Sequence, residues 1–157
     1  MQFLYKQKIL SLIEKSLMND RFFLDTNIII YAYSNDEPKK QEIANTILEE
    51  YGSQILISTQ VINELSNTFF RKFKLKAQAV EDVVLELNSN FSIVNFNLQT
   101  QLKAIKIKEI YQLQFYDSMI LATALENGCN IIYSEDMQNG QIIENQLTIL
   151  NPFDKIK

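Results

Sequence analysis

Five short apolar runs, separated by longer segments with helical periodicity, constrain the fold of this chain more than any other feature. The runs cover residues 21–24, 54–57, 92–94, 130–133 and 147–150. Short apolar strands that alternate with helices are typical of a parallel sheet covered by helices on both faces. The sequence therefore predicts an α/β fold, namely a three-layer α/β/α sandwich around a central, mostly parallel sheet.

The segments between these runs carry the usual signals of helix boundaries. Pro38 suits the first turn of a helix that ends near Gly52. Ser58 or Thr59 can cap the next helix, which follows the second apolar run. A further helix is predicted over 76–87. Two more helices are expected over residues 98–110 and 115–127.

The first residues stand apart from this pattern. Leu4, Ile9, Ile13 and Leu17 can share one stripe of an amphipathic helix over residues 1–19. We therefore expect a helical extension over 1–20 followed by one domain over 21–153. Met18 leaves open whether residues 1–17 belong to the natural protein.

Four acidic residues occupy the places where an α/β sheet binds its ligands. Asp25 and Asp136 follow two of the predicted strands, whereas Glu64 and Asp117 lie early in two of the predicted helices. If both strands are parallel and central, Asp25 and Asp136 meet at the carboxyl edge of the sheet. Each acid alone also has a simpler interpretation, such as a turn, a helix cap or an interaction with the helix dipole. The four together favour a common site.

The residue types that are missing narrow the chemistry. The chain contains no histidine and a single cysteine, Cys129. This excludes imidazole acid–base catalysis, nucleophiles paired with histidine, and cysteine or histidine zinc sites. Cys129 is therefore expected to be a buried or half-buried structural residue. Carboxylates are the main groups left for catalysis.

Several carboxylates at one edge repel each other unless some are protonated or a cation neutralises them. Oxygen ligands select hard cations, so Mg²⁺ or Mn²⁺ is the expected cofactor. Such ions activate water and stabilise charge on a phosphodiester under attack.

The motifs that carry these acids resemble those of PIN-domain nucleases, and most closely the toxins of VapBC-type toxin–antitoxin pairs. The resemblance spans about residues 21–152 and rests on four motifs in order: Phe23-Leu24-Asp25-Thr26-Asn27, Gln60-Val61-Ile62-Asn63-Glu64, Tyr116-Asp117-Ser118-Met119-Ile120, and Tyr133-Ser134-Glu135-Asp136.

This resemblance implies a metal-dependent endoribonuclease in which Asp25, Glu64, Asp117 and Asp136 bind the metal. Asn27 and Ser134 match supporting positions, and Glu135 is expected to point away from the metal. The resemblance also implies an antitoxin partner, often with a basic side chain that reaches the acids, and a homodimer. The chain departs from the wider family in its first 19 residues and in having Ser-Glu-Asp in the last motif.

The charge distribution leaves the nucleic-acid surface open. The net charge is −4, but Arg71, Lys72, Lys74 and Lys76 form one basic stretch and Lys103, Lys106 and Lys108 another. Each stretch is either a solvated part of a helix or a contact for phosphates of the RNA backbone. The first is the candidate RNA contact. No run of the roughly 20 apolar residues needed to span a membrane is present, so we expect a cytoplasmic protein without a membrane partner.

Three other functions remain compatible with parts of this pattern. One is a related nuclease that cuts DNA or matures RNA without an antitoxin. Another is a PIN-like interaction module without catalysis, although retention of all four acids disfavours it. The third is phosphoryl transfer through Asp25, which would need a second aspartate where Asn27 stands.

Overall fold

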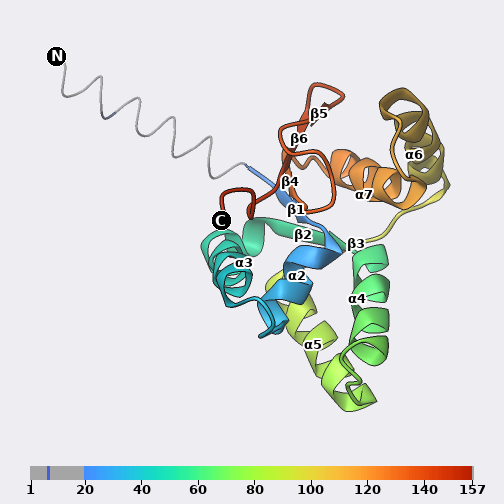
Figure 1. The fold of residues 1–157 in the computed structure, drawn as a ribbon. Helices are drawn as coiled ribbons and strands as arrows, with labels where there is room; N and C mark the ends of the chain where they lie inside the picture. Colours follow the sequence, from blue (N-terminus) through green and yellow to red (C-terminus); the bar gives the residue numbers. More distant parts are fainter. Residues whose placement is uncertain (1–6, 8–19, 157) are drawn as a thin grey trace.

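The computed structural model describes residue 7 and residues 20–156. Residues 20–156 form a twisted sheet with helices on both sides (Figure 1). The strand order is β3-β2-β1-β4-β6-β5, and all neighbouring strands are parallel except the pair β5 and β6. The strands are β1 (Phe22–Leu24), β2 (Ile55–Ser58), β3 (Ser92–Val94), β4 (Ile131–Tyr133), β5 (Ile142–Ile143) and β6 (Leu147–Leu150). The predicted α/β fold with a mostly parallel sheet is confirmed.

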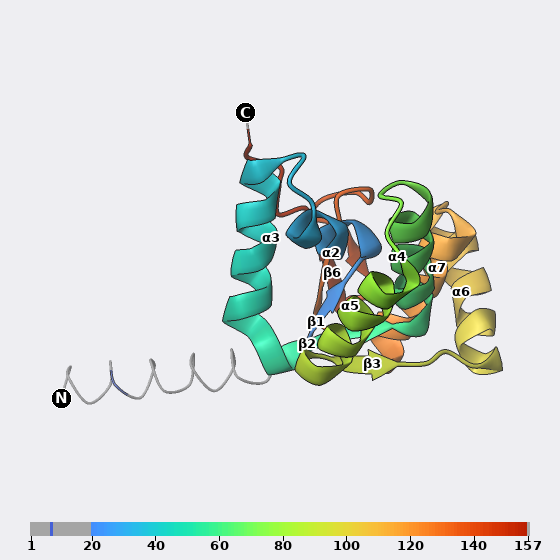
Figure 2. The same cartoon turned by 90° about the horizontal axis from the view of Figure 1, so that it is seen from below.

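The helices follow the strands in the alternation that the sequence predicts. They are α2 (Thr26–Tyr33), α3 (Pro38–Tyr51), α4 (Thr59–Arg71), α5 (Ala77–Asn90), α6 (Leu98–Tyr111) and α7 (Phe115–Glu126), with a short 3-10 turn over Gly52–Gln54. In both views α3 lies on one side of the sheet and the pair α6 and α7 on the other (Figure 2). The chain is therefore a three-layer sandwich.

The strand order creates a switch point between β1 and β4. The chain passes from β1 to β2 and β3 on one side, then returns to place β4 on the other side of β1. Leu24 and Tyr133 are paired at the carboxyl ends of the two strands. A crevice beyond the strand ends at such a point is where open α/β sheets bind ligands.

Two elements differ from the sequence-based expectation. Helix α2 occupies the apolar run after Asp25, which the sequence pattern left unassigned, because Asp25 caps it and Ile28 and Ile29 are buried. Strand β5 was not predicted. It pairs with β6 through a tight turn in which Glu144 and Asn145 have φ of 51° and 54°. Turns with such left-handed backbone usually contain glycine, but neither residue here is a glycine.

Other expectations hold closely. Of the two caps that the sequence allowed for α4, Ser58 is the one that forms, by accepting a hydrogen bond from the Val61 amide at 3.2 Å. Cys129 is fully buried ahead of β4, and burial raises the pKa of its thiol to about 12. The predicted helix over 1–19 lies outside the described residues, apart from residue 7, and the domain boundary at residue 20 stays a prediction. Of the helices in the described part of the chain, none combines the length and apolarity of a bilayer crossing.

Candidate active site

Asp25 lies at the centre of the candidate site, at the end of the buried strand β1. Its backbone amide donates to Tyr133 of β4 at 3.0 Å, which holds the residue at the switch point. One carboxylate oxygen caps α2 through the Thr26 amide at 2.7 Å, and the other accepts from the Ser134 hydroxyl at 2.7 Å. The Asp25 side chain is only 5% exposed.

Asn27 and Ser134 join the two strand-end acids. The Asn27 amide nitrogen donates to Asp136 at 3.0 Å and approaches Asp25 at 3.4 Å. Ser134 donates to Asp25 and accepts from the Asp136 backbone amide at 3.3 Å. The two supporting residues named from the sequence therefore lie between Asp25 and Asp136.

Glu64 reaches the same place from α4. Its carboxylate accepts from the Thr26 hydroxyl at 2.7 Å and from the Gln60 side chain at 2.9 Å. Both donors stand in the motifs quoted above, but neither was assigned a role from the sequence. Gln60 lies four residues before Glu64 on one helix, a spacing that places both side chains on one face and could have revealed it. Thr26 lies 38 residues away from Glu64, and no local signal connects them.

Electrostatic repulsion couples Asp117 to the other acids. Asp117 stands in the first turn of α7, and its pKa is raised by burial and by the negative charges of Asp136 and Glu64. Burial raises the pKa of Asp25 to about 6, opposed by its hydrogen bonds to Ser134 and Thr26 and assisted by the charges of Asp117 and Glu64. The fold thus brings all four predicted acids within electrostatic range of one another.

These four carboxylates have no cationic partner in the described chain, because none of the ion pairs there involves them. Their donor atoms are all oxygens, which fits Mg²⁺ or Mn²⁺ and not a softer metal. In their present rotamers, however, no three acids within residues 20–156 are close enough to enclose an ion. Glu64 is held by Thr26 and Gln60, and Asp136 by Asn27, so a bound cation would have to compete with those hydrogen bonds.

The neighbouring acid Glu135 faces elsewhere. Its carboxylate accepts hydrogen bonds from Tyr31 and from Lys40 of α3, each at 2.5 Å. Its backbone amide donates to the Asn27 side chain at 3.3 Å. This acid is neutralised by a lysine of the chain itself and fastens the loop that carries Asp136.

The basic stretch is remote from direct contact with the acids. Arg71, Lys72, Lys74 and Lys76 are exposed at the end of α4 and in the following loop. Arg71 lies seven residues after Glu64, about 10 Å along the same helix face. Arg71, Lys72 and Lys74 line a shallow cavity of about 490 Å³ together with Asn67 and Thr68.

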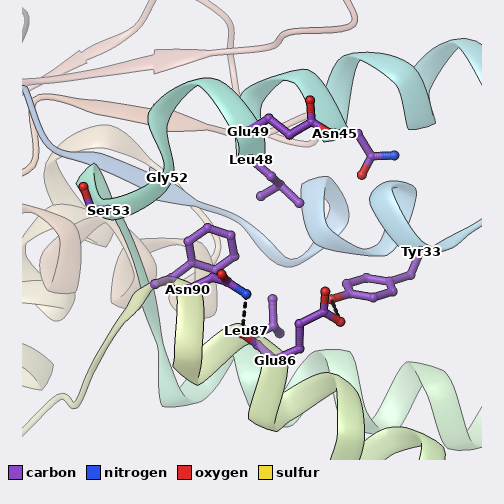
Figure 3. Close-up of a pocket in the computed structure, with 10 residues that line it drawn as sticks. Tyr33, Asn45, Leu48, Glu49, Gly52, Ser53, Glu86, Leu87 and Asn90 are labelled. Atoms are coloured by element: carbon purple, nitrogen blue, oxygen red, sulfur yellow. Dashed lines mark hydrogen bonds between the residues drawn. The ribbon is translucent and has the colours of Figure 1, made fainter.

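Two further cavities differ in their relation to the acids. One of about 540 Å³ shares Glu64 with the acidic site and is otherwise lined by aromatic, amide and apolar side chains of α4, α6, α7 and the segment before α6. The other, of about 480 Å³, lies between α2, α3 and α5 and includes none of the four acids (Figure 3). There Tyr33 donates to Glu86 at 3.0 Å across the space (Figure 3).

Comparison with known proteins agrees with this fold. The family model described as PIN domain matches residues 22–139. No curated protein matches the sequence. Among solved structures, a toxin–antitoxin complex from Klebsiella pneumoniae is similar with a TM-score of 0.65 and 21% identity over 83% of this chain and 96% of that chain.

Two other solved structures share the fold. A DNA-bound VapBC from Salmonella typhimurium is similar with a TM-score of 0.64 and 21% identity, over 83% of this chain and 96% of the other. The VapC20 toxin of Mycobacterium tuberculosis, which cleaves the sarcin–ricin loop, has a TM-score of 0.60 and 13% identity over 73% and 91% of the two chains.

Proposed function

The chain belongs to the PIN domain family, and on that premise we propose that it is a metal-dependent endoribonuclease and the toxin of a toxin–antitoxin pair. The observation that most supports the proposal is the convergence of Asp25, Glu64, Asp117 and Asp136 at the switch point, where no cation from the described residues pairs with them. The pKa values of Asp25 and Asp117 are raised by burial and by the charges of neighbouring acids, and such a site is poised to accept an external cation.

The proposed metal ligands are these same four carboxylates. When bound, Mg²⁺ or Mn²⁺ would supply an activated water and neutralise charge on the phosphodiester. The protein's own contribution is placement. Ser134 and Thr26 orient Asp25, and Asn27 orients Asp136, through the hydrogen bonds described above. Burial of Asp25 keeps water from screening the charges at the bottom of the site.

The decisive experiment measures cleavage of labelled single-stranded RNA by the purified chain with Mn²⁺, Mg²⁺ or EDTA. Asp25→Asn should lower the rate roughly a thousandfold, because loss of a metal ligand removes several kcal/mol of charge stabilisation. Asp82→Asn is the matched control, since Asp82 is exposed on α5. Cleavage that persists in EDTA or in Asp25→Asn would refute the metal mechanism, and absence of any cleavage would favour a non-catalytic module.

The RNA is proposed to run from the acids along α4 toward Arg71, Lys72, Lys74 and Lys76. Arg71 on the Glu64 face could contact a phosphate near the one being cut, since the two side chains lie about two helical turns apart. Removing Arg71 and Lys72 should raise KM and reduce its dependence on salt, as expected when phosphate contacts are lost. An unchanged salt dependence would place the RNA elsewhere.

The proposed partner is an antitoxin, because the similar structures from Klebsiella and Salmonella are toxin–antitoxin assemblies. We also propose that the protein acts in the cytoplasm, where the proposed RNA substrate and antitoxin would be found. Co-expression with the product of the neighbouring gene should yield a stable complex in which RNA cleavage is blocked. Growth arrest on expressing the chain alone, relieved by that product and absent in Asp25→Asn, would support the toxin role. A neighbour that neither binds nor inhibits would contradict it.

A homodimer is proposed through α6. Leu98, Leu102 and Ile105 are 66%, 46% and 54% exposed and share one face of that helix. An exposed apolar stripe of this kind marks a protein interface, and a second copy is the occupant that the toxin role supports. Ile105→Lys should halve the mass measured by light scattering toward the 18.3 kDa of one chain. Ile110→Lys, exposed on another face of α6, should leave it unchanged.

A further inference from the structure

The cavity beside Glu64 has a lining that differs from the rest of the acidic site. Phe96, Phe115 and Tyr116 supply aromatic rings, and the apolar floor includes Met119, which is 3% exposed. Three amide side chains, those of Gln60, Asn63 and Gln101, complete the wall. Its volume of about 540 Å³ lies in the range of pockets that hold small organic ligands.

The charge of the lining indicates what the cavity would take. Apart from Glu64, the described residues that line it are uncharged. A phosphate would therefore find no basic partner there, whereas a flat neutral ring would find aromatic faces and amide groups. Asn63 and Gln101 are exposed, and their side chains make no hydrogen bond with other described residues. Their amide groups remain available to the edge of such a ring.

Tyr116 gives the cavity its most accessible aromatic surface. Its side chain is 70% exposed, although its backbone carbonyl is held by Gln60 at 3.3 Å. Phe115 packs edge-on against the Tyr116 ring, with a centroid distance of 5.7 Å. An exposed aromatic ring presents a face on which a nucleobase can stack.

The position of the cavity connects it to the proposed chemistry. Gln60 lines the cavity and also donates to Glu64, and Asp117 directly follows Tyr116. A nucleotide whose phosphate lies at the acids would therefore have its base within reach of this lining. Sequence-specific recognition of RNA usually works through unstacked bases that rest on aromatic side chains and are read by hydrogen bonds.

We propose that this cavity is a nucleobase subsite, which takes one base of a single-stranded RNA beside the phosphodiester at the acidic site. The inference rests on the proposed ribonuclease function. Tyr116 stacks on the base, while Asn63 and Gln101 hydrogen-bond to its edge. These three residues set a base preference at one position next to the cut, and they act on binding more than on the chemical step.

The test uses cleavage of a random-sequence single-stranded RNA pool with Mn²⁺, followed by sequencing of the fragment ends. The full chain should show a base preference at one position flanking the cut. Tyr116→Ala should flatten that preference and raise KM about five- to a hundredfold, the usual effect of losing a stacked aromatic, while kcat changes little. Leu85→Ala, which is 57% exposed on α5, is the matched control and should change neither.

A substrate without a base at the preferred position separates stacking from general damage. For the full chain, the abasic RNA should be cleaved with a KM close to that of Tyr116→Ala on intact RNA. For Tyr116→Ala, removing that base should have little additional effect, since the two changes delete the same contact. Independent, additive effects, or an unchanged base preference in Tyr116→Ala, would overturn the subsite.

Two further readouts separate this inference from the proposed function. If the chain cleaves no RNA, saturation-transfer NMR with nucleoside 5′-monophosphates and with ribose 5-phosphate still tests the cavity. Saturation of base protons that is lost in Tyr116→Ala supports the subsite, and its absence in the full chain refutes it. If Tyr116→Ala instead changes the mass measured by light scattering, a second copy covers the cavity and the nucleobase assignment is wrong.

Discussion

Glu135 and Asp136 are neighbours in the chain, yet their carboxylates belong to opposite electrostatic environments. Glu135 accepts hydrogen bonds from Tyr31 of α2 and from Lys40 of α3, and the lysine matches its charge. Asp136 faces Asn27 and Asp117, where it adds to the repulsion among the clustered acids. The same loop thus supplies two different carboxylates. Glu135 is paired with a lysine, whereas Asp136 has no cationic partner among the described residues.

The difference separates acids that hold the fold from acids that are available for chemistry. The Lys40–Glu135 pair, whose side chains are 17% and 25% exposed, fastens the loop and already has its counter-ion. The cluster around Asp25 is kept negative although burial and repulsion oppose it, which lowers stability unless an external cation binds. Such a cost at one place is typical of a functional site.

The largest expected effect comes from removing a charge in the cluster. Asp117→Asn should reduce RNA cleavage roughly a thousandfold, because a proposed metal ligand is lost. It should also preserve or raise the melting temperature of the metal-free chain, since repulsion by Asp136 and Glu64 is relieved. Cleavage assays and thermal unfolding in EDTA test both effects. Full activity in this variant would remove Asp117 from the site. A large fall in melting temperature would show that Asp117, like Glu135, stabilises the fold.

The next effect is a pH dependence of stability that arises at Asp25. The pKa of Asp25 in the folded chain is about 6, above the ordinary aspartate value of 3.8. Between these two pH values the native chain therefore keeps a proton that the unfolded chain has lost. Below this interval Asp25 has no effect on the free energy of unfolding. As pH rises through the interval the free energy of unfolding falls, and above it the loss due to Asp25 is about 3 kcal/mol.

Asp25→Asn removes this dependence. In metal-free urea titrations, the variant should gain about 2 kcal/mol relative to the original chain between about pH 4 and about pH 7. Comparing the two proteins cancels the titration of the other acids. A stability difference that is constant over this range would show that Asp25 is an ordinary ionised carboxylate.

A smaller loss of stability should follow when the paired acid loses its cation. Lys40→Met keeps an apolar chain against Tyr31 but leaves Glu135 without its charged donor, at a cost of about 1.5 kcal/mol in unfolding free energy. Urea unfolding of this variant, of Glu135→Gln and of the double variant measures the coupling between the two residues. Effects that add without coupling would show that the pair does not fasten the loop.

The smallest effect is expected at an exposed ion pair. Lys103 and Glu144 are 3.2 Å apart with side chains 30% and 43% exposed. Lys103→Ala should change the free energy of unfolding by less than about 0.5 kcal/mol, because solvent screens such pairs. A loss as large as that of Lys40→Met would mean that burial is not what distinguishes the Lys40–Glu135 pair.

Much of the fold could be predicted because its signals are local. Apolar runs located the strands β1, β2, β3, β4 and β6 to within a residue or so at each end, and the cap at Ser58 located α4. Helix α2 was not assigned, because its β-branched residues have weak helical propensity and their burial decides its form. Strand β5 is two residues long and exists only through its pairing with β6.

The partners of the candidate site were harder to predict. The acids could be named because each follows a strand or opens a helix. Thr26 and the cation Lys40 could not, since polar side chains of these kinds occur throughout the surface and only their contacts distinguish them. Gln60 was missed as well, although its position four residues before Glu64 on one helix is a signal that could have revealed it. The roles of the acids and of the basic stretch at Arg71 remain predictions for the experiments above.

By itself, the sequence determined the alternation of strands and helices, the absence of imidazole chemistry and the four acids on which a cation site would depend. Local periodicity and residue type carry that information. Only the tertiary structure decided that Asp25 is buried among like charges while Glu135, next to Asp136, is paired with Lys40. The environment of a charge depends on every group packed around it, and those groups come from segments far apart in the chain.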